Sequence, residues 1–139
     1  MPPDDSNIPN ARYAELEARL GHTFRNPALC ETAMTHTSWL NEAGQPERSD
    51  NERLEFLGDA VLDLVVSDVL MRRFPTRREG DLSRARAALV SESALAQVAV
   101  GIELGRFILL GRGEERTGGR ARPSILANTL EALEREAKS

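Results

Sequence analysis

The sequence predicts an all-α protein that forms one domain. Apolar residues recur at steps of three and four along nearly the whole chain, which is helical spacing, and few stretches alternate with the two-residue period of a strand. Asparagine, serine, glycine and proline residues stand at intervals that mark helix ends. The length of 139 residues suits a single domain. We therefore expect a flexible N-terminal tail over residues 1–9 and one helical domain over residues 10–139.

Asparagine caps mark the first two helices. Asn10 is expected to cap the first helix, which Gly21 would end. Asn26 is expected to cap the second, because the following Pro27 suits the first helical position, where no backbone donor is needed. The polar stretch 41–49 is typical of a loop.

The longest helix is expected over residues 51–73, and Phe74-Pro75 should end it. Its apolar residues repeat at three- and four-residue steps, as one buried face of a helix requires. That expected face consists of Leu54, Leu57, Val61, Leu64, Val65 and Val69.

Three more helices are expected towards the C-terminus. One covers residues 82–89, one follows Ser91, and Ser124 would cap the last. Between them, the apolar segment 101–113 should turn back over the core, and residues 114–122 should form a charged loop. On the last two helices, the residues expected to face the core are Leu95, Val98, Ala99, Leu126, Leu130, Leu133 and Ala137.

Composition limits the classes of function. The 22 acidic and 18 basic residues give a net charge of -4, which disfavours a nucleic-acid partner when averaged over the chain. The charge is uneven, since residues 72–122 hold eleven arginines and six acidic residues. Arginine suits phosphate contacts, although a GC-rich genome would give the same bias. One cysteine, short apolar runs and an acidic N-terminus predict a cytoplasmic protein with no internal disulfide, membrane span or signal peptide.

A row of acidic residues follows the polar side of the longest predicted helix. Glu52, Glu55 and Asp59 lie at helical spacing on one face, and the last helix carries Asn128 and Glu131 three residues apart. Such a row is common on solvated helix surfaces. Carboxylate and amide oxygens are also the ligands that Mg²⁺ prefers. Spacing alone leaves both interpretations open.

Residues 51–62, Asn-Glu-Arg-Leu-Glu-Phe-Leu-Gly-Asp-Ala-Val-Leu, closely resemble the signature motif of the ribonuclease III family of double-stranded-RNA endonucleases. The segments 35–39 (Thr-His-Thr-Ser-Trp), 79–83 (Glu-Gly-Asp-Leu-Ser) and 124–127 (Ser-Ile-Leu-Ala) occur in the order of that family. The resemblance covers about residues 13–133 and implies a helical endonuclease domain.

The resemblance also implies roles for particular residues. Asp59 and Glu131 would be catalytic, and the metal ligands would be Glu55, Asp59, Asn128 and Glu131. Glu52 and Glu79 would be secondary acidic residues of the cleft. The implied cofactor is Mg²⁺, with Mn²⁺ as a substitute and no organic cofactor. The implied reaction is metal-assisted hydrolysis of phosphodiester bonds.

The implied partners are double-stranded RNA and a second copy of the chain. Phe56 would insert into the partner subunit in a homodimer, with an ordinary core position as the alternative. The loop arginines are equally compatible with phosphate contacts and with solvated charge. They are Arg112, Arg116, Arg120 and Arg122.

Three features depart from the family pattern. Asn128 replaces an aspartate, which predicts weaker metal affinity and slower cleavage. The charged end 134–139 replaces an apolar run and is expected to shorten the last helix. We expect no double-stranded-RNA-binding domain after the helical domain, and without one duplex binding should be weak and salt-dependent. The alternative function is a catalytically weakened or inactive domain that binds double-stranded RNA or dimerises.

Overall fold

The structure, a computed structural model, describes residues 8–44 and 49–138, with side chains placed for 13–44 and 49–134. The described elements are α1 (Ile8–Leu20), α2 (Pro27–Ala33), α3 (Thr37–Ala43), α4 (Glu52–Arg73), α5 (Glu79–Leu89), α6 (Glu92–Gly101), η1 (Leu104–Phe107), α7 (Arg112–Arg116), η2 (Gly119–Ala121) and α8 (Pro123–Lys138). An isolated bridge pairs Thr35 with Leu109. The all-α prediction is confirmed.

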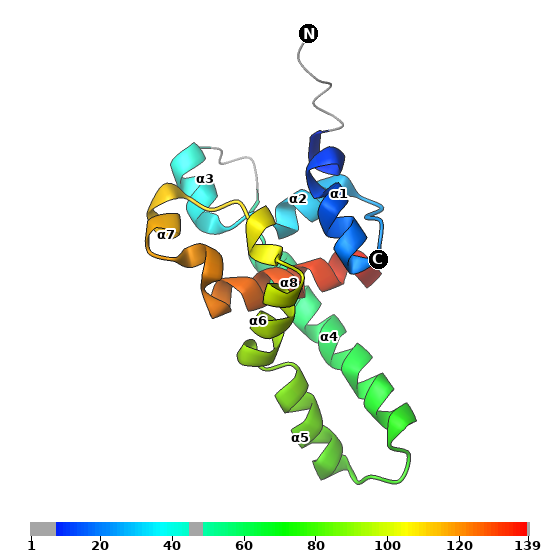
Figure 1. Ribbon diagram of the computed structural model, residues 1–139. Coiled ribbons are helices and arrows are strands. Elements are labelled where there is room, and N and C mark those ends of the chain that lie inside the picture. Colours follow the sequence, from blue (N-terminus) through cyan, green and yellow to red (C-terminus); the bar gives the residue numbers. More distant parts are fainter. Residues whose placement is uncertain (1–7, 45–48, 139) are drawn as a thin grey trace.

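Helix α8 forms the centre of the core. Residues 125–127 and 129–133 are all buried, so this helix is enclosed on nearly every side. Helices α4 and α6 make its most extensive contacts, and α2, η1 and η2 cover other parts of it. Figure 1 shows α8 crossing the middle of the molecule, while α4 continues past it and forms a long hairpin with α5. The buried residues of α8 belong to one core cluster that also includes Tyr13, Leu16, Met34, Leu95, Ala99 and Leu104.

Several helix ends lie where the sequence predicts them. The Asn26 side chain accepts hydrogen bonds from the N–H groups of Ala28 and Leu29, and Pro27 is the first residue of α2. Gly21 ends α1 at φ +65°, a conformation that glycine adopts without strain. Ser91 caps α6 by accepting a hydrogen bond from the N–H of Ala94.

Other predicted ends are wrong. Helix α1 begins at Ile8, so Asn10 is inside it; residues 1–7 of the expected tail are outside the described part. Helix α3 continues to Ala43, which shortens the expected loop 41–49, of which residues 45–48 are not described. Arg122, not Ser124, holds the capping position of α8, because its carbonyl accepts the Leu126 N–H.

The C-terminal expectations also change. The segment 114–122, expected as a loop, holds α7 and η2, since its turns close on local backbone hydrogen bonds. Helix α8 runs to Lys138, so the charged end does not shorten it. Ala137 of the expected inner face has no described side chain.

Three of the six residues in the expected buried face of α4 are exposed in the single chain, and the other three are half-buried. Leu64 is 71% exposed, and Leu57 and Val69 are also exposed, because α4 packs on α8 through Leu54, Gly58 and Leu62. Val98 of α6, expected in the core, is exposed as well. Beyond α8, the C-terminal part of α4 contacts α5. An apolar surface therefore follows α4.

No described helix has both the length and the apolar character that crossing a membrane requires.

Candidate active site

The site begins with a close crossing of α4 and α8 at Gly58. A Cβ atom on this residue would overlap the carbonyl oxygen of Glu131 and lie 2.6 Å from its carbonyl carbon. Only glycine therefore lets the two backbones approach this closely. Glu55 and Asp59 stand one turn before and one residue after Gly58, so the crossing brings both towards Glu131.

Glu131 is the most strongly perturbed acid in the described part of the chain. Its side chain is 9% exposed. Burial, a hydrogen bond with Asp59 and the charges of Asp59, Glu55 and Asp63 raise the pKa of Glu131 to about 8. At neutral pH and without a cation, Glu131 is therefore protonated. Perturbation of this kind, by burial together with charge partners, is common at functional sites.

Glu55 extends the acidic site towards the start of α4. Its half-buried position, together with the charges of Glu52 and Asp59, raises its pKa above the ordinary value. Among the described residues, no arginine or lysine forms an ion pair with Glu55, Asp59 or Glu131. The acids repel one another, and such a group is stabilised by protons or by a cation.

Asn128 lies beside Glu55 at a small pocket between α4, α8 and the start of α3. The pocket has a volume of 170 Å³ and is lined by His36, Thr37, Asp50, Asn51, Glu52, Glu55, Ile125 and Asn128. Asn128 is half-buried, whereas residues 125–127 and 129–133 on either side of it in α8 are buried. The structure therefore brings Glu55, Asp59, Asn128 and Glu131 to one region.

The donor set fits a hard divalent cation, because all four candidate ligands offer oxygen atoms. Within residues 13–44 and 49–134, however, no three His, Cys, Asp or Glu side chains are already arranged around a common metal position. When no cation is bound, burial and the neighbouring acids keep Glu131 protonated at neutral pH. A cation would have to displace that proton.

Asn51 anchors the N-terminus of α4 and is a site residue that the sequence analysis did not single out. It is 7% exposed, and its Nδ2 donates to the Ala33 carbonyl at 3.0 Å and to Thr129 Oγ1 at 3.4 Å. Its backbone N–H donates to the Thr35 carbonyl at 2.9 Å. These bonds fix α4 against α2 and α8 beside Asn128. Asn51 opens the motif 51–62, but its partners are distant in sequence.

The secondary acidic residues do not share one cleft within a single chain. Glu52 is exposed at the pocket rim. Glu79 accepts a hydrogen bond from Ser83 and lies beside Leu70, about 22 Å along α4 from Glu55 at 1.5 Å per residue. The side chain of Phe56 on α4 is a separate case. It is 82% exposed, so the alternative prediction that Phe56 is an ordinary core residue is wrong. Its insertion into a partner stays a prediction.

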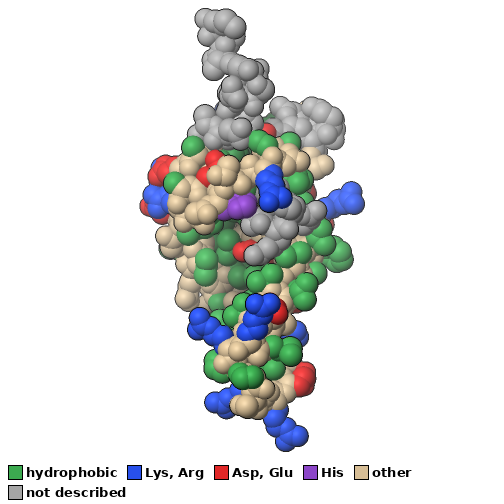
Figure 2. Space-filling view, turned by 90° about the vertical axis from the view of Figure 1, so that its right-hand side faces the viewer, with side chains coloured by type: hydrophobic (Ala, Val, Ile, Leu, Met, Phe, Trp, Pro, Cys, Tyr) green, Lys and Arg blue, Asp and Glu red, His purple; other side chains and the backbone are tan. Residues whose placement is uncertain are grey.

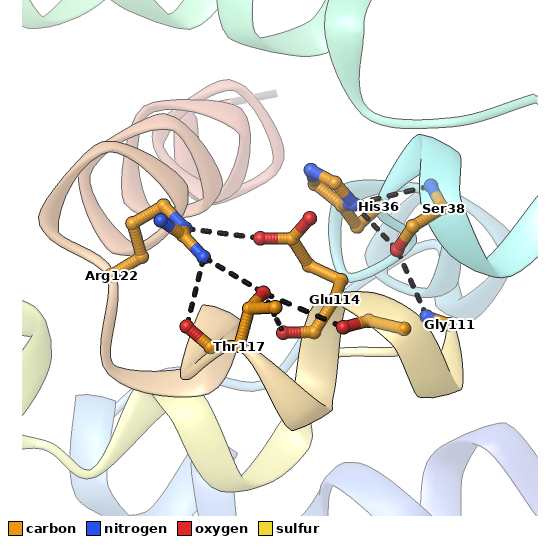
Figure 3. Close-up of polar contacts among 7 residues, drawn as sticks. His36, Ser38, Gly111, Glu114, Thr117 and Arg122 are labelled. Atoms are coloured by element: carbon orange, nitrogen blue, oxygen red, sulfur yellow. Dashed lines mark hydrogen bonds and ion pairs between the residues drawn. The ribbon is translucent and has the colours of Figure 1, made fainter.

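Two of the four loop arginines have structural roles. Arg120 donates to the carbonyls of Gly105 and Ile108 at 2.7 and 2.9 Å, and Arg122 binds Glu114 and Thr117 (Figure 3). These two are therefore poor candidates for phosphate contacts, whereas Arg112 and Arg116 are exposed.

Figure 2 shows further basic side chains around the lower end of the molecule, which the α4–α5 hairpin forms. The exposed arginines of this hairpin are Arg72, Arg73, Arg77, Arg78 and Arg84.

The fold and the site together define a class of protein: a helical domain in which two helices cross at a glycine beside a group of acidic side chains. A family model described as Ribonuclease-III-like matches residues 26–134. The chain belongs to this family.

Sequence relatives agree with the family model. The chain is 53% identical over 131 residues to Ribonuclease 3 of Geobacter metallireducens, which covers 94% of this chain and 53% of that protein. It is 50% identical over 123 residues to Ribonuclease 3 of Geobacillus kaustophilus, with coverage of 88% and 50%. The chain thus spans about half the length of the curated relatives that it matches.

Solved structures agree on the fold. The nuclease domain of ribonuclease III from Campylobacter jejuni has a TM-score of 0.79 and 46% identity, and the match covers 87% of this chain and 80% of that one. A second structure of that domain gives a TM-score of 0.77 at 47% identity, with coverage of 86% and 78%.

Proposed function

We propose that this chain is the nuclease part of an endoribonuclease that hydrolyses phosphodiester bonds of double-stranded RNA with a divalent metal ion. The observation that carries the proposal is the unpaired carboxylate group at the Gly58 crossing, where the pKa of Glu131 is raised to about 8. Its high identity to proteins named Ribonuclease 3 supports the proposal. We also infer a cytoplasmic location, since the relatives that the chain matches are bacterial proteins named Ribonuclease 3.

Glu55, Asp59, Asn128 and Glu131 would hold the metal. Mg²⁺ suits this all-oxygen set, and Mn²⁺ would serve as a substitute. When bound, the ion would lower the pKa of a coordinated water and neutralise charge on the leaving oxygen. Asp59 and Glu131 lie within hydrogen-bonding distance of each other, so both would be placed to coordinate the ion and the water that it binds.

A homodimer would complete this function. The apolar surface of α4, with Phe56, Leu57 and Leu64 exposed, has the chemistry of an interface that a second copy would cover. One related Campylobacter jejuni structure is described as flexible in a region involved in dimer formation. Glu79 lies beside Leu70, about four turns along α4 from Glu55, so it would not join the acidic site of its own chain.

Asn128 favours a second candidate function, a binding or dimerisation domain that retains the fold with reduced or lost cleavage. The neutral amide lowers the charge available to a cation by one unit. Against this candidate, the three carboxylates around the Gly58 crossing are retained.

Incubation of the purified chain with a long duplex RNA, with and without Mg²⁺ or Mn²⁺, separates the two functions. The proposed enzyme yields shortened duplexes only when metal is present. A duplex that is bound but stays uncut at every metal concentration supports the binding domain instead.

A further inference from the structure

His36 is held in one orientation at the edge of the acidic pocket. Its backbone N–H donates to the Leu109 carbonyl at 3.1 Å. Its ring Nδ1 lies 2.8 Å from Ser38 Oγ and accepts the Ser38 backbone N–H at 3.1 Å. Ser38 Oγ in turn accepts the Gly111 N–H at 2.9 Å. Figure 3 shows this chain of contacts, with the second ring nitrogen of His36 pointing away from Ser38 and Gly111.

These contacts fix which ring nitrogen carries hydrogen. A backbone N–H can only donate, so Nδ1 must accept, and the neutral ring carries its hydrogen on Nε2. The half-buried His36 therefore has an Nε2–H donor that its own support network leaves unused. A donor held by a second hydrogen-bonded group is preorganised for binding.

The pocket beside His36 has an unusual charge balance for a site that receives an anion. Its lining includes Asp50, Glu52 and Glu55, and no described arginine or lysine belongs to it. The charged side chains that a phosphate oxygen would meet here are all carboxylates, so it would need neutral donors. The side-chain N–H donors of the lining belong to His36, Asn51 and Asn128. The Asn51 amide already donates to the Ala33 carbonyl and to Thr129 Oγ1.

We propose that His36 contacts the substrate by donating its Nε2–H to a phosphate oxygen of the RNA strand that occupies this pocket. The inference rests on the proposed function, because it assumes that an RNA backbone reaches Glu55. It assigns to His36 a role in holding the strand, so that its loss raises Kd and KM more than it lowers kcat.

Two substitutions separate this role from the role of His36 in capping α3. His36→Asn keeps the capping contact, because the asparagine oxygen can accept the Ser38 N–H, but removes the donor at the Nε2 position. His36→Gln places an amide N–H near the Nε2 position but loses the Nδ1 acceptor. Duplex RNA binding is measured without divalent metal, cleavage with Mg²⁺, and folding by the melting temperature.

A hydrogen bond to a charged phosphate predicts at least about a tenfold rise in Kd and KM for His36→Asn, with an unchanged melting temperature. His36→Gln should recover part of the affinity although its cap is weaker. Equal Kd and KM for His36→Asn and the wild type would overturn the inference, and wild-type cleavage in the same assay would leave the proposed function intact. A lower melting temperature in both variants with unchanged affinity of the folded protein would also overturn it. Failure of the wild type both to bind and to cleave duplex RNA would overturn both proposals.

Discussion

Asn128 shows how one neutral side chain changes an acidic site. It shares a pocket wall with Glu55 and Glu52, whose charges already repel. Asn128→Asp should therefore lower the melting temperature without metal, because it adds a negative charge to this group. It should also reduce, by about tenfold, the Mg²⁺ concentration that gives half-maximal cleavage, because divalent affinity rises with ligand charge. A metal titration of cleavage checks this, and identical midpoints for the variant and the wild type would contradict it.

Glu131 predicts an unusual dependence of stability on pH. Its pKa is raised from 4.5 to about 8 on folding, so between these values the folded chain binds more protons than the unfolded chain. The free energy of unfolding should therefore fall as pH rises across this window when metal is absent. Glu131→Gln keeps the neutral form and should remove the decline, which amounts to a few kcal/mol at most. Urea unfolding from about pH 5 to pH 9 tests this, and equal slopes for both proteins would refute it.

Individual residues were predictable where the sequence motif carried the information. Glu55, Asp59 and Glu131 lie close together in the structure, and their roles as metal ligands stay predictions. The structural role of Arg120 could not be predicted from the sequence, because the carbonyls of Gly105 and Ile108 to which it donates lie 15 and 12 residues away. The role of Asn51 depends on contacts with Ala33 and Thr129 that only folding creates.

The crossing of α4 and α8 is the element contact on which the site depends. Gly58→Ala would force the α4 backbone away from Glu131, so we expect a loss of roughly 1–3 kcal/mol or more in the free energy of unfolding. Gly101→Ala, at the end of α6 with open space around its Cβ position, is the matched control and should be nearly neutral. Similar unfolding midpoints for the two variants would contradict the role of Gly58.

Elements were predictable where local capping decides them. Asn26 and Ser91 begin helices through hydrogen bonds to the next few residues, which sequence reveals directly. The inward face of α4 was not predictable, because Gly58 rather than a large apolar residue marks its contact with α8. Periodicity identified an apolar stripe and could not distinguish a core face from a face that another subunit covers.

At the scale of the whole molecule, the apolar surface of α4 predicts self-association. Leu64 is 71% exposed, and Leu64→Glu places a charge on the proposed interface without disturbing the core. The wild type should sediment as a dimer and this variant as a monomer with an unchanged helix content. Val100→Glu, on α6 and 64% exposed, is the control and should remain dimeric. A monomeric wild type at micromolar concentration, or a dimeric Leu64→Glu variant, would contradict the interface.

The structure shows where the acidic residues behind the net charge of -4 lie. Part of the acidic surplus gathers at the Gly58 crossing, where a cation would neutralise it. A group of exposed arginines lies instead at the α4–α5 hairpin (Figure 2). An acidic chain therefore stays compatible with RNA binding, because its charges are separated in space.

The most direct test of a metal-dependent nuclease site at this crossing compares two aspartates of α4. Asp59 is hydrogen-bonded to Glu131, whereas Asp68 forms an exposed ion pair with Arg72 at 3.1 Å. The rate of duplex RNA cleavage in Mg²⁺ should fall at least about a hundredfold in Asp59→Asn, because one metal ligand loses its charge. It should stay within about twofold of the wild type in Asp68→Asn, because an exposed ion pair contributes little. Equal rates for the two variants, or cleavage by Asp59→Asn at the wild-type rate, would contradict the assignment.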